Sequence, residues 1–77
     1  MVMAPDKLVY MANQIATFFA SMPPEEASAG VAEHINSFWE PRMRAQLFAL
    51  AEAGDAGLSP LVREALPKIR RPAVAQG

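Results

Sequence analysis

Few side chains in this chain of 77 residues could take part in catalysis. The only histidine is His34, and Ser37 follows it closely enough to share a helix face. A serine nucleophile also needs an orienting acid and donors for the oxyanion, and neither is evident near this pair. The pair is therefore interpreted as two helix-surface residues without a catalytic role.

Carboxylates, metal ligands and phosphate-binding loops are equally sparse. Glu25 and Glu26 are adjacent, so they point in different directions, and their acidity suits the start of a helix. The chain has no cysteine, and one imidazole cannot hold zinc without several converging carboxylates. Gly54 and Gly57 alone do not make a phosphate-binding loop. The sequence thus predicts no catalytic, cofactor-binding or metal-binding residue and no enzyme activity of the chain on its own.

One stretch, residues 38–44, is unusual for a solvated helical corner. Two large aromatic residues end one expected helix, and two arginines open the next, where a cation opposes the helix dipole. Arginine and tryptophan are also enriched among the residues that dominate binding energy. For Phe38 and Trp39 the pattern leaves core and interface equally open, whereas for Arg42 and Arg44 it favours the interface. The predicted partner interface comprises Phe38, Trp39, Pro41, Arg42, Met43, Arg44 and His34, with Phe18 and Phe19 as core or second contact.

The elements that position these residues are set out by prolines. Proline costs little at the first helical position but about 3 kcal/mol in a helix interior, so each proline is expected to open or close a helix. The spacing predicts helices over 5–21, 24–39 and 41–53, and a short helix over 60–66 with Ser59 as its N-cap. Gly54 is the expected stop of the third helix, and residues 54–57 read as a turn.

Apolar residues recur at helical spacing, and no strand-like alternation is present. The predicted fold is all-α, a small orthogonal bundle of three to four short helices within residues 1–66. Residues 67–77 show no periodicity. They are expected to form an irregular, proline-containing tail that is extended or becomes ordered on a partner.

Composition indicates a binding protein. Hydrophobic residues make up 52% of the chain, and a domain this small buries only about 60% of its unfolded surface, so surplus apolar surface predicts an interface. The net charge of −1 falls short of the basic patch that nucleic acids require. No apolar run has the length of a membrane span and no signal peptide is visible, so a cytoplasmic location is expected.

Three stretches, in order, resemble one protein family. Residues 34–44, His-Ile-Asn-Ser-Phe-Trp-Glu-Pro-Arg-Met-Arg, closely resemble the signature of the delta subunit of soluble NAD-dependent formate dehydrogenases. Residues 8–16, Leu-Val-Tyr-Met-Ala-Asn-Gln-Ile-Ala, with the two phenylalanines that follow, resemble the opening of that family. Residues 57–62, Gly-Leu-Ser-Pro-Leu-Val, resemble a stretch near its end. The resemblance covers about residues 7–66 and does not include the tail.

This resemblance implies a place in a molybdenum- or tungsten-dependent complex that oxidises formate to carbon dioxide with NAD as acceptor. The alpha subunit of such a complex carries bis-molybdopterin guanine dinucleotide and iron–sulfur clusters, the beta subunit carries FMN, and a gamma subunit belongs to the same assembly. The delta subunit is expected to bind no cofactor itself. It is expected to dock on the alpha subunit, without catalysing a reaction, and to stabilise it or assist insertion of its molybdopterin cofactor.

Three other functions remain open from the residues alone. The first is a transient maturation chaperone that binds the same enzyme and leaves. The second, less favoured because of the near-neutral charge, is a small DNA-binding regulator. The third is a self-associating helical protein unrelated to any enzyme.

Overall fold

The computed structural model describes residues 4–54 and 57–71, and these form an all-helical fold without strands. The chain folds into α1 (Pro5–Phe19), α2 (Pro24–Phe38), α3 (Pro41–Glu52) and α4 (Pro60–Ala65), followed by a 3₁₀ turn, η1 (Leu66–Lys68). The all-α prediction is therefore confirmed. The expected turn at 54–57 includes Asp55 and Ala56, which lie outside the described residues.

Every α-helix begins at a proline, as the sequence predicts. The residue before each of these four helix-opening prolines has an extended backbone, with ψ between 137° and 157°, because the proline ring disfavours helical geometry at that position. Ser59 is the N-cap of α4, and its hydroxyl accepts a hydrogen bond from the Val62 N–H at 3.4 Å. Gly54 follows the end of α3 with a φ of +126°, a conformation that side chains disfavour.

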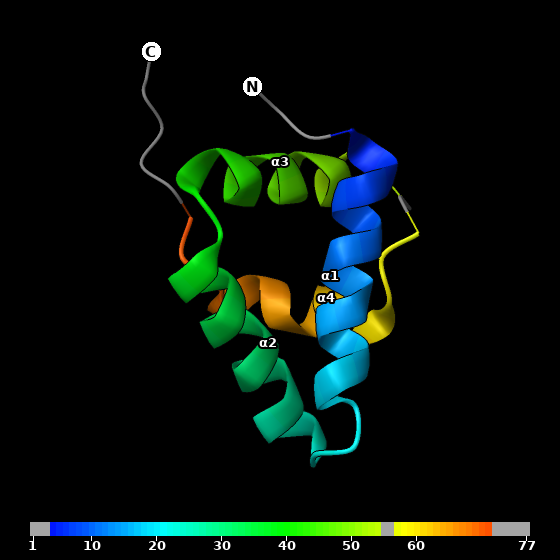
Figure 1. Cartoon of the computed structure of the whole chain (residues 1–77), viewed down its shortest axis with the longest axis vertical. Coiled ribbons are helices and arrows are strands. Elements are labelled where there is room, and N and C mark those ends of the chain that lie inside the picture. Colours follow the sequence, from blue (N-terminus) through cyan, green and yellow to red (C-terminus); the bar gives the residue numbers. More distant parts are fainter. Residues whose placement is uncertain (1–3, 55–56, 72–77) are drawn as a thin grey trace.

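Two helices form a V, and the other two lie across it (Figure 1). α1 and α2 pack against each other near the loop that joins them and diverge from there like the arms of a V. α3 lies across the open end of the V, and α4 crosses between the two arms, where it contacts both. α2 is packed against α1, α4 and η1, and α1 is packed against α2, α3 and α4.

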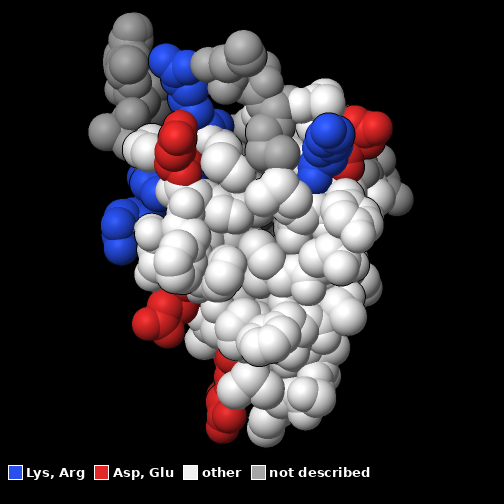
Figure 2. All heavy atoms as spheres, in the orientation of Figure 1, with Lys and Arg blue, Asp and Glu red and all other residues white. Residues whose placement is uncertain are grey.

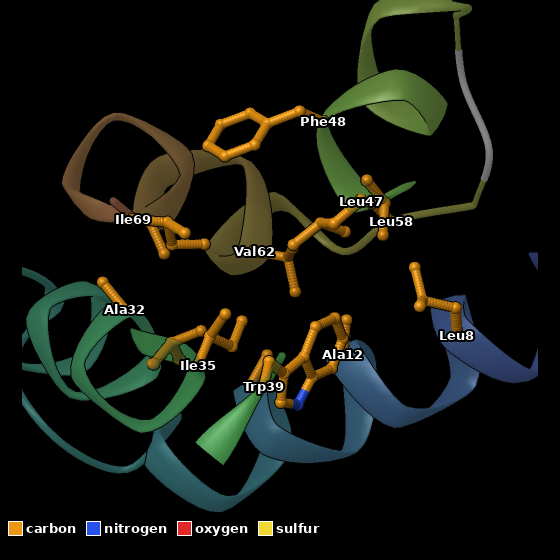
Figure 3. Packing of buried hydrophobic residues seen from close by; sticks show 13 residues of the cluster. Leu8, Ala12, Ala32, Ile35, Trp39, Leu47, Phe48, Leu58, Val62 and Ile69 are labelled. Carbon is orange, nitrogen blue, oxygen red and sulfur yellow. The ribbon is translucent and has the colours of Figure 1, made fainter. Parts of the chain in front are cut away.

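The core lies where these four helices meet (Figure 3). Leu8 and Ala12 come from α1, Ile35 from α2, Leu47 from α3 and Val62 from α4, and each is fully buried. The small alanine on α1 lets neighbouring side chains approach the helix closely, so a short chain can still bury large aliphatic groups.

The segment after α4 contributes to this core. Ile69 is only 4% exposed and packs in the same cluster as the helices. Asn36 holds the segment to α2, because its side-chain amide donates to the Lys68 carbonyl at 3.3 Å and accepts from the Arg70 N–H at 2.7 Å. Of the predicted tail, residues 67–71 thus pack on this chain, and residues 72–77 lie outside the described residues.

Candidate partner interface

The corner between α2 and α3 turns its largest side chain inward. Trp39 is the C-cap of α2, and its extended backbone, with φ −90° and ψ 136°, directs the indole away from the continuing helix path. The residue is only 5% exposed, and Figure 3 shows the indole between Ile35 and Ala12. Of the two possibilities that the sequence left open for Trp39, the structure of the isolated chain places it in the core.

Arg44 is also directed toward its own chain. It is 8% exposed, and its guanidinium donates from Nη1 to the Trp39 carbonyl at 2.9 Å and from Nε to the Arg70 carbonyl at 3.0 Å. The Trp39 carbonyl belongs to the C-terminal end of α2, where the helix dipole favours a cation. The positive charge of Arg44 therefore opposes the dipole of its own helix, α3, but is favourable at the C-terminal end of α2.

The remaining corner residues differ in exposure. Pro41 and Arg42 are exposed, whereas Met43 is half-buried and packs against the core cluster. Only part of the predicted interface at the corner is therefore accessible on the free chain.

A different surface combines the other aromatic residues of the prediction. Phe18 on α1 is 78% exposed and Phe38 on α2 is 73% exposed. Phe19 and His34 lie half-buried between them: the Phe18 and Phe19 ring centroids are 5.1 Å apart, and those of His34 and Phe38 are 4.8 Å apart. The four rings thus form two contacting pairs, one on each helix.

Two adjoining hollows connect these pairs, and both are lined by Phe19 and His34. One, of about 290 Å³, is completed by Gln14, Ile15 and Phe18. The other, of about 250 Å³, is completed by Gly30, Glu33, Ser37 and Phe38. We call these two hollows between α1 and α2 together the aromatic groove. It brings together Phe18, Phe19, His34 and Phe38 of the predicted interface and excludes Trp39 and Arg44.

The groove depends on close packing between the two helices at Gly30. A Cβ atom built on Gly30 would lie 2.6 Å from two ring carbons of Phe19, closer than atoms can pack. Glycine at this position lets the Phe19 ring rest directly on the α2 backbone. The floor of the groove is therefore held in place by the helix contact.

Two asparagines, which the sequence analysis did not single out, fix the segments around this scaffold. Asn13 on α1 donates from Nδ2 to the Gly57 carbonyl at 2.9 Å and accepts from the Ser59 N–H at 2.8 Å, and so it anchors the α3–α4 connection. Asn36 does the same for the segment after η1. The sequence feature that could have identified these two residues is an asparagine at the edge of an apolar helix face, because its side-chain amide can hydrogen-bond main-chain atoms of a neighbouring segment.

The described residues do not assemble other kinds of site. Among them, no group of three or more His, Cys, Asp or Glu side chains is arranged to hold a metal ion. No helix in residues 4–54 and 57–71 has the length and apolar character needed to cross a membrane.

Comparison with known proteins identifies a family for this arrangement. The model of a family described as NADH-dependent formate dehydrogenase delta subunit FdsD matches residues 7–66. The matched range contains α2, α3, α4, nearly all of α1 and every residue that lines the aromatic groove. No curated protein and no solved structure gives a match to the chain.

Proposed function

Because this chain belongs to the NADH-dependent formate dehydrogenase delta subunit family, we propose that it is a non-catalytic accessory subunit that docks on the catalytic alpha subunit. The observation that carries the proposal is the family match over residues 7–66, which includes the three stretches on which the resemblance was based. In this proposal, docking stabilises the alpha subunit or assists insertion of its molybdopterin cofactor.

The chemistry of the chain supports a division of labour among subunits. Its 77 residues contain no cysteine, the residue whose thiolate holds iron–sulfur clusters. In the proposed arrangement, the other subunits carry the molybdenum or tungsten centre, the iron–sulfur clusters and the FMN. Formate oxidation and NAD reduction take place there, and the delta subunit contributes binding energy.

The shape of the chain supports a binding role as well. Two phenylalanines with more than two-thirds of their surface exposed flank a groove whose lining is mainly apolar. Exposed large apolar groups that lie together mark interaction surfaces more often than scattered ones do.

Co-purification tests the proposal. The genes of the complex would be expressed together with an affinity tag on the alpha subunit, in cells with and without the delta subunit. The delta chain should be recovered at fixed stoichiometry with enzyme that contains metal and reduces NAD with formate. Without the delta chain, a lower yield of alpha subunit would indicate stabilisation, and a lower metal content per alpha subunit would indicate assisted insertion.

The same preparation separates the alternative function. A transient maturation chaperone would be recovered with metal-free enzyme and would be absent from the active complex. Recovery of the delta chain in neither preparation would contradict docking on the alpha subunit altogether.

A further inference from the structure

The aromatic groove is the largest set of exposed aromatic side chains in the described part of the chain. Phe18 and Phe38 flank it from opposite helices, and both keep most of their surface in water. The floor of the groove is preorganised. Gly30 has no Cβ atom, so the Phe19 ring rests directly against the α2 backbone. Rings that are already positioned lose little conformational freedom when a partner binds, and this favours affinity.

The charges around the groove indicate what kind of partner it fits. Glu33 is the only acid or base other than His34 among the lining residues. From residue 8 to residue 39 the chain carries Glu25, Glu26 and Glu33 but no lysine or arginine. Figure 2 shows a broad uncharged area over the lower part of α1 and α2, with acidic residues along the α2 edge. The groove is therefore lined mainly by uncharged residues, with Glu33 as its one acid and no lysine or arginine.

We propose that the aromatic groove is the docking site for an amphipathic helical segment of the catalytic alpha subunit. The apolar side of that segment contacts Phe18 and Phe38, and lysine or arginine residues along its edge pair with Glu33. A helix fits because the groove runs between two helices, and a third helix can present apolar side chains at successive turns to it. This inference rests on the proposed function, since it names the surface by which the accessory subunit docks.

Electrostatics disfavours a second copy of this chain as the occupant. A symmetric dimer through the groove would place the same patch of each copy against the other. Glu33 of each copy would then face the same groove of the other, and no lysine or arginine lines the groove to offset it. Like charges brought together at an interface oppose association, whereas a basic partner segment gains from the same acids.

The decisive experiment compares two double variants of the full chain in the co-expressed complex. Phe18→Ala/Phe38→Ala removes both rings of the groove. Tyr10→Ala/Arg70→Ala removes two exposed side chains outside the groove, one of them aromatic, and serves as the matched control. Circular dichroism of the isolated variants checks that helix content is retained. The readout is the amount of delta chain captured per tagged alpha subunit, and its dissociation constant where both can be purified.

Loss of the two rings should weaken binding by at least about 30-fold, the effect expected for residues that dominate an interface, while the control changes it only a few-fold. If wild type and the groove variant bind equally, the groove inference is overturned and the proposed docking stands. If wild-type chain itself is not captured, the proposed function fails and the inference fails with it. If the wild-type chain forms a discrete dimer, the groove variant is monomeric and capture by the alpha subunit is unchanged, the occupant is a second copy and the inference is overturned.

The charge argument has its own test. Glu33→Lys should weaken capture by the alpha subunit and flatten its dependence on salt, because it replaces an attractive ion pair with a repulsive one. Glu64→Lys, the same substitution at an exposed position on α4, is the matched control. Equal binding of both variants at low salt would exclude a basic partner segment at the α2 edge.

Discussion

At the scale of single residues, the α2–α3 corner shows that residue types common at interfaces can instead stabilise the core. Trp39 and Arg44 belong to residue types that are enriched at interfaces. Here the indole fills the core, and the guanidinium binds the carbonyl of the same tryptophan. The two side chains hold the corner together, so their first effect is on the stability of the chain, and this can be measured without any partner.

Trp39→Ala should unfold the isolated chain. Removing a buried tryptophan costs about 3–5 kcal/mol, as much as the whole stability of a small domain without disulfides. Helix content measured by circular dichroism should fall at 25 °C, whereas Trp39→Phe should keep part of it. A folded Trp39→Ala chain that no longer joins the complex would instead show that the indole contacts the partner.

Arg44→Lys should lower the free energy of unfolding by about 1–3 kcal/mol, since one ammonium cannot reproduce the two directed bonds of the guanidinium. Those bonds reach the Trp39 and Arg70 carbonyls from separate nitrogen atoms. Urea denaturation of the isolated chain measures the change. Arg42→Lys, in the same helix turn but exposed, should leave stability within error; an equal loss in both variants would contradict the role given to Arg44.

Asn13→Asp should also lower the free energy of unfolding, by about 1–3 kcal/mol, because the carboxylate has no N–H to donate to the Gly57 carbonyl. The acceptor for the Ser59 N–H is retained, so the loss reports on a single donor. The matched control is Gln14→Glu, the same change of amide to acid at the next, exposed position. Denaturant melts that coincide for the two variants would show that Asn13 does not anchor the loop.

At the scale of elements, helix starts follow local chemistry and helix contacts follow residue size. A proline begins each α-helix because it needs no intrahelical bond there. The contact between α1 and α2 depends instead on Gly30, a poor helix former that leaves space for Phe19.

Gly30→Ala should therefore fail to give the gain in stability that alanine normally brings to a helix. In an open position the gain is about 1 kcal/mol, but here the new Cβ forces the Phe19 ring to move. In the background of Phe19→Ala the same substitution should stabilise the chain. A double-mutant cycle by urea denaturation measures this coupling, and equal effects of Gly30→Ala in both backgrounds would contradict the packing described.

At the scale of the whole molecule, the core extends past the last α-helix. The family match ends at Leu66, yet Ile69 packs in the core and Asn36 and Arg44 bind the segment around it. In a chain of this size, each buried aliphatic residue supplies a larger share of the total burial than it would in a large domain. The segment after η1 is therefore a structural part of the domain.

Ile69→Ala should cost about 2–5 kcal/mol of unfolding free energy, the range for truncating a buried aliphatic side chain. Arg70→Ala is the neighbouring control, because its side chain is exposed and its main-chain bonds to Asn36 and Arg44 remain. Thermal melts of the two variants should differ clearly. Coincident melts would show that residues after η1 do not contribute to the core.

The sequence by itself determined the helices and the family. Proline position, apolar spacing and the Ser59 cap depend on local geometry, so the helix starts could be predicted, and the ends to within two residues. The three stretches that resemble the delta subunit family were sufficient to predict the family, and the family match confirms that resemblance. For the candidate interface, the sequence supplied the residues Phe18, Phe19, His34 and Phe38 but not their relation to one another.

Only the tertiary structure decided which of the aromatic and basic residues are accessible. Trp39 and Phe38 are adjacent in the chain, and the end of α2 between them turns one inward and leaves the other in water. Arg44 meets the end of α2 because the chain folds back at Pro41, and the aromatic groove exists because α1 and α2 pack at Gly30. These contacts join residues from different helices, and local sequence rules do not specify how one helix is placed against another.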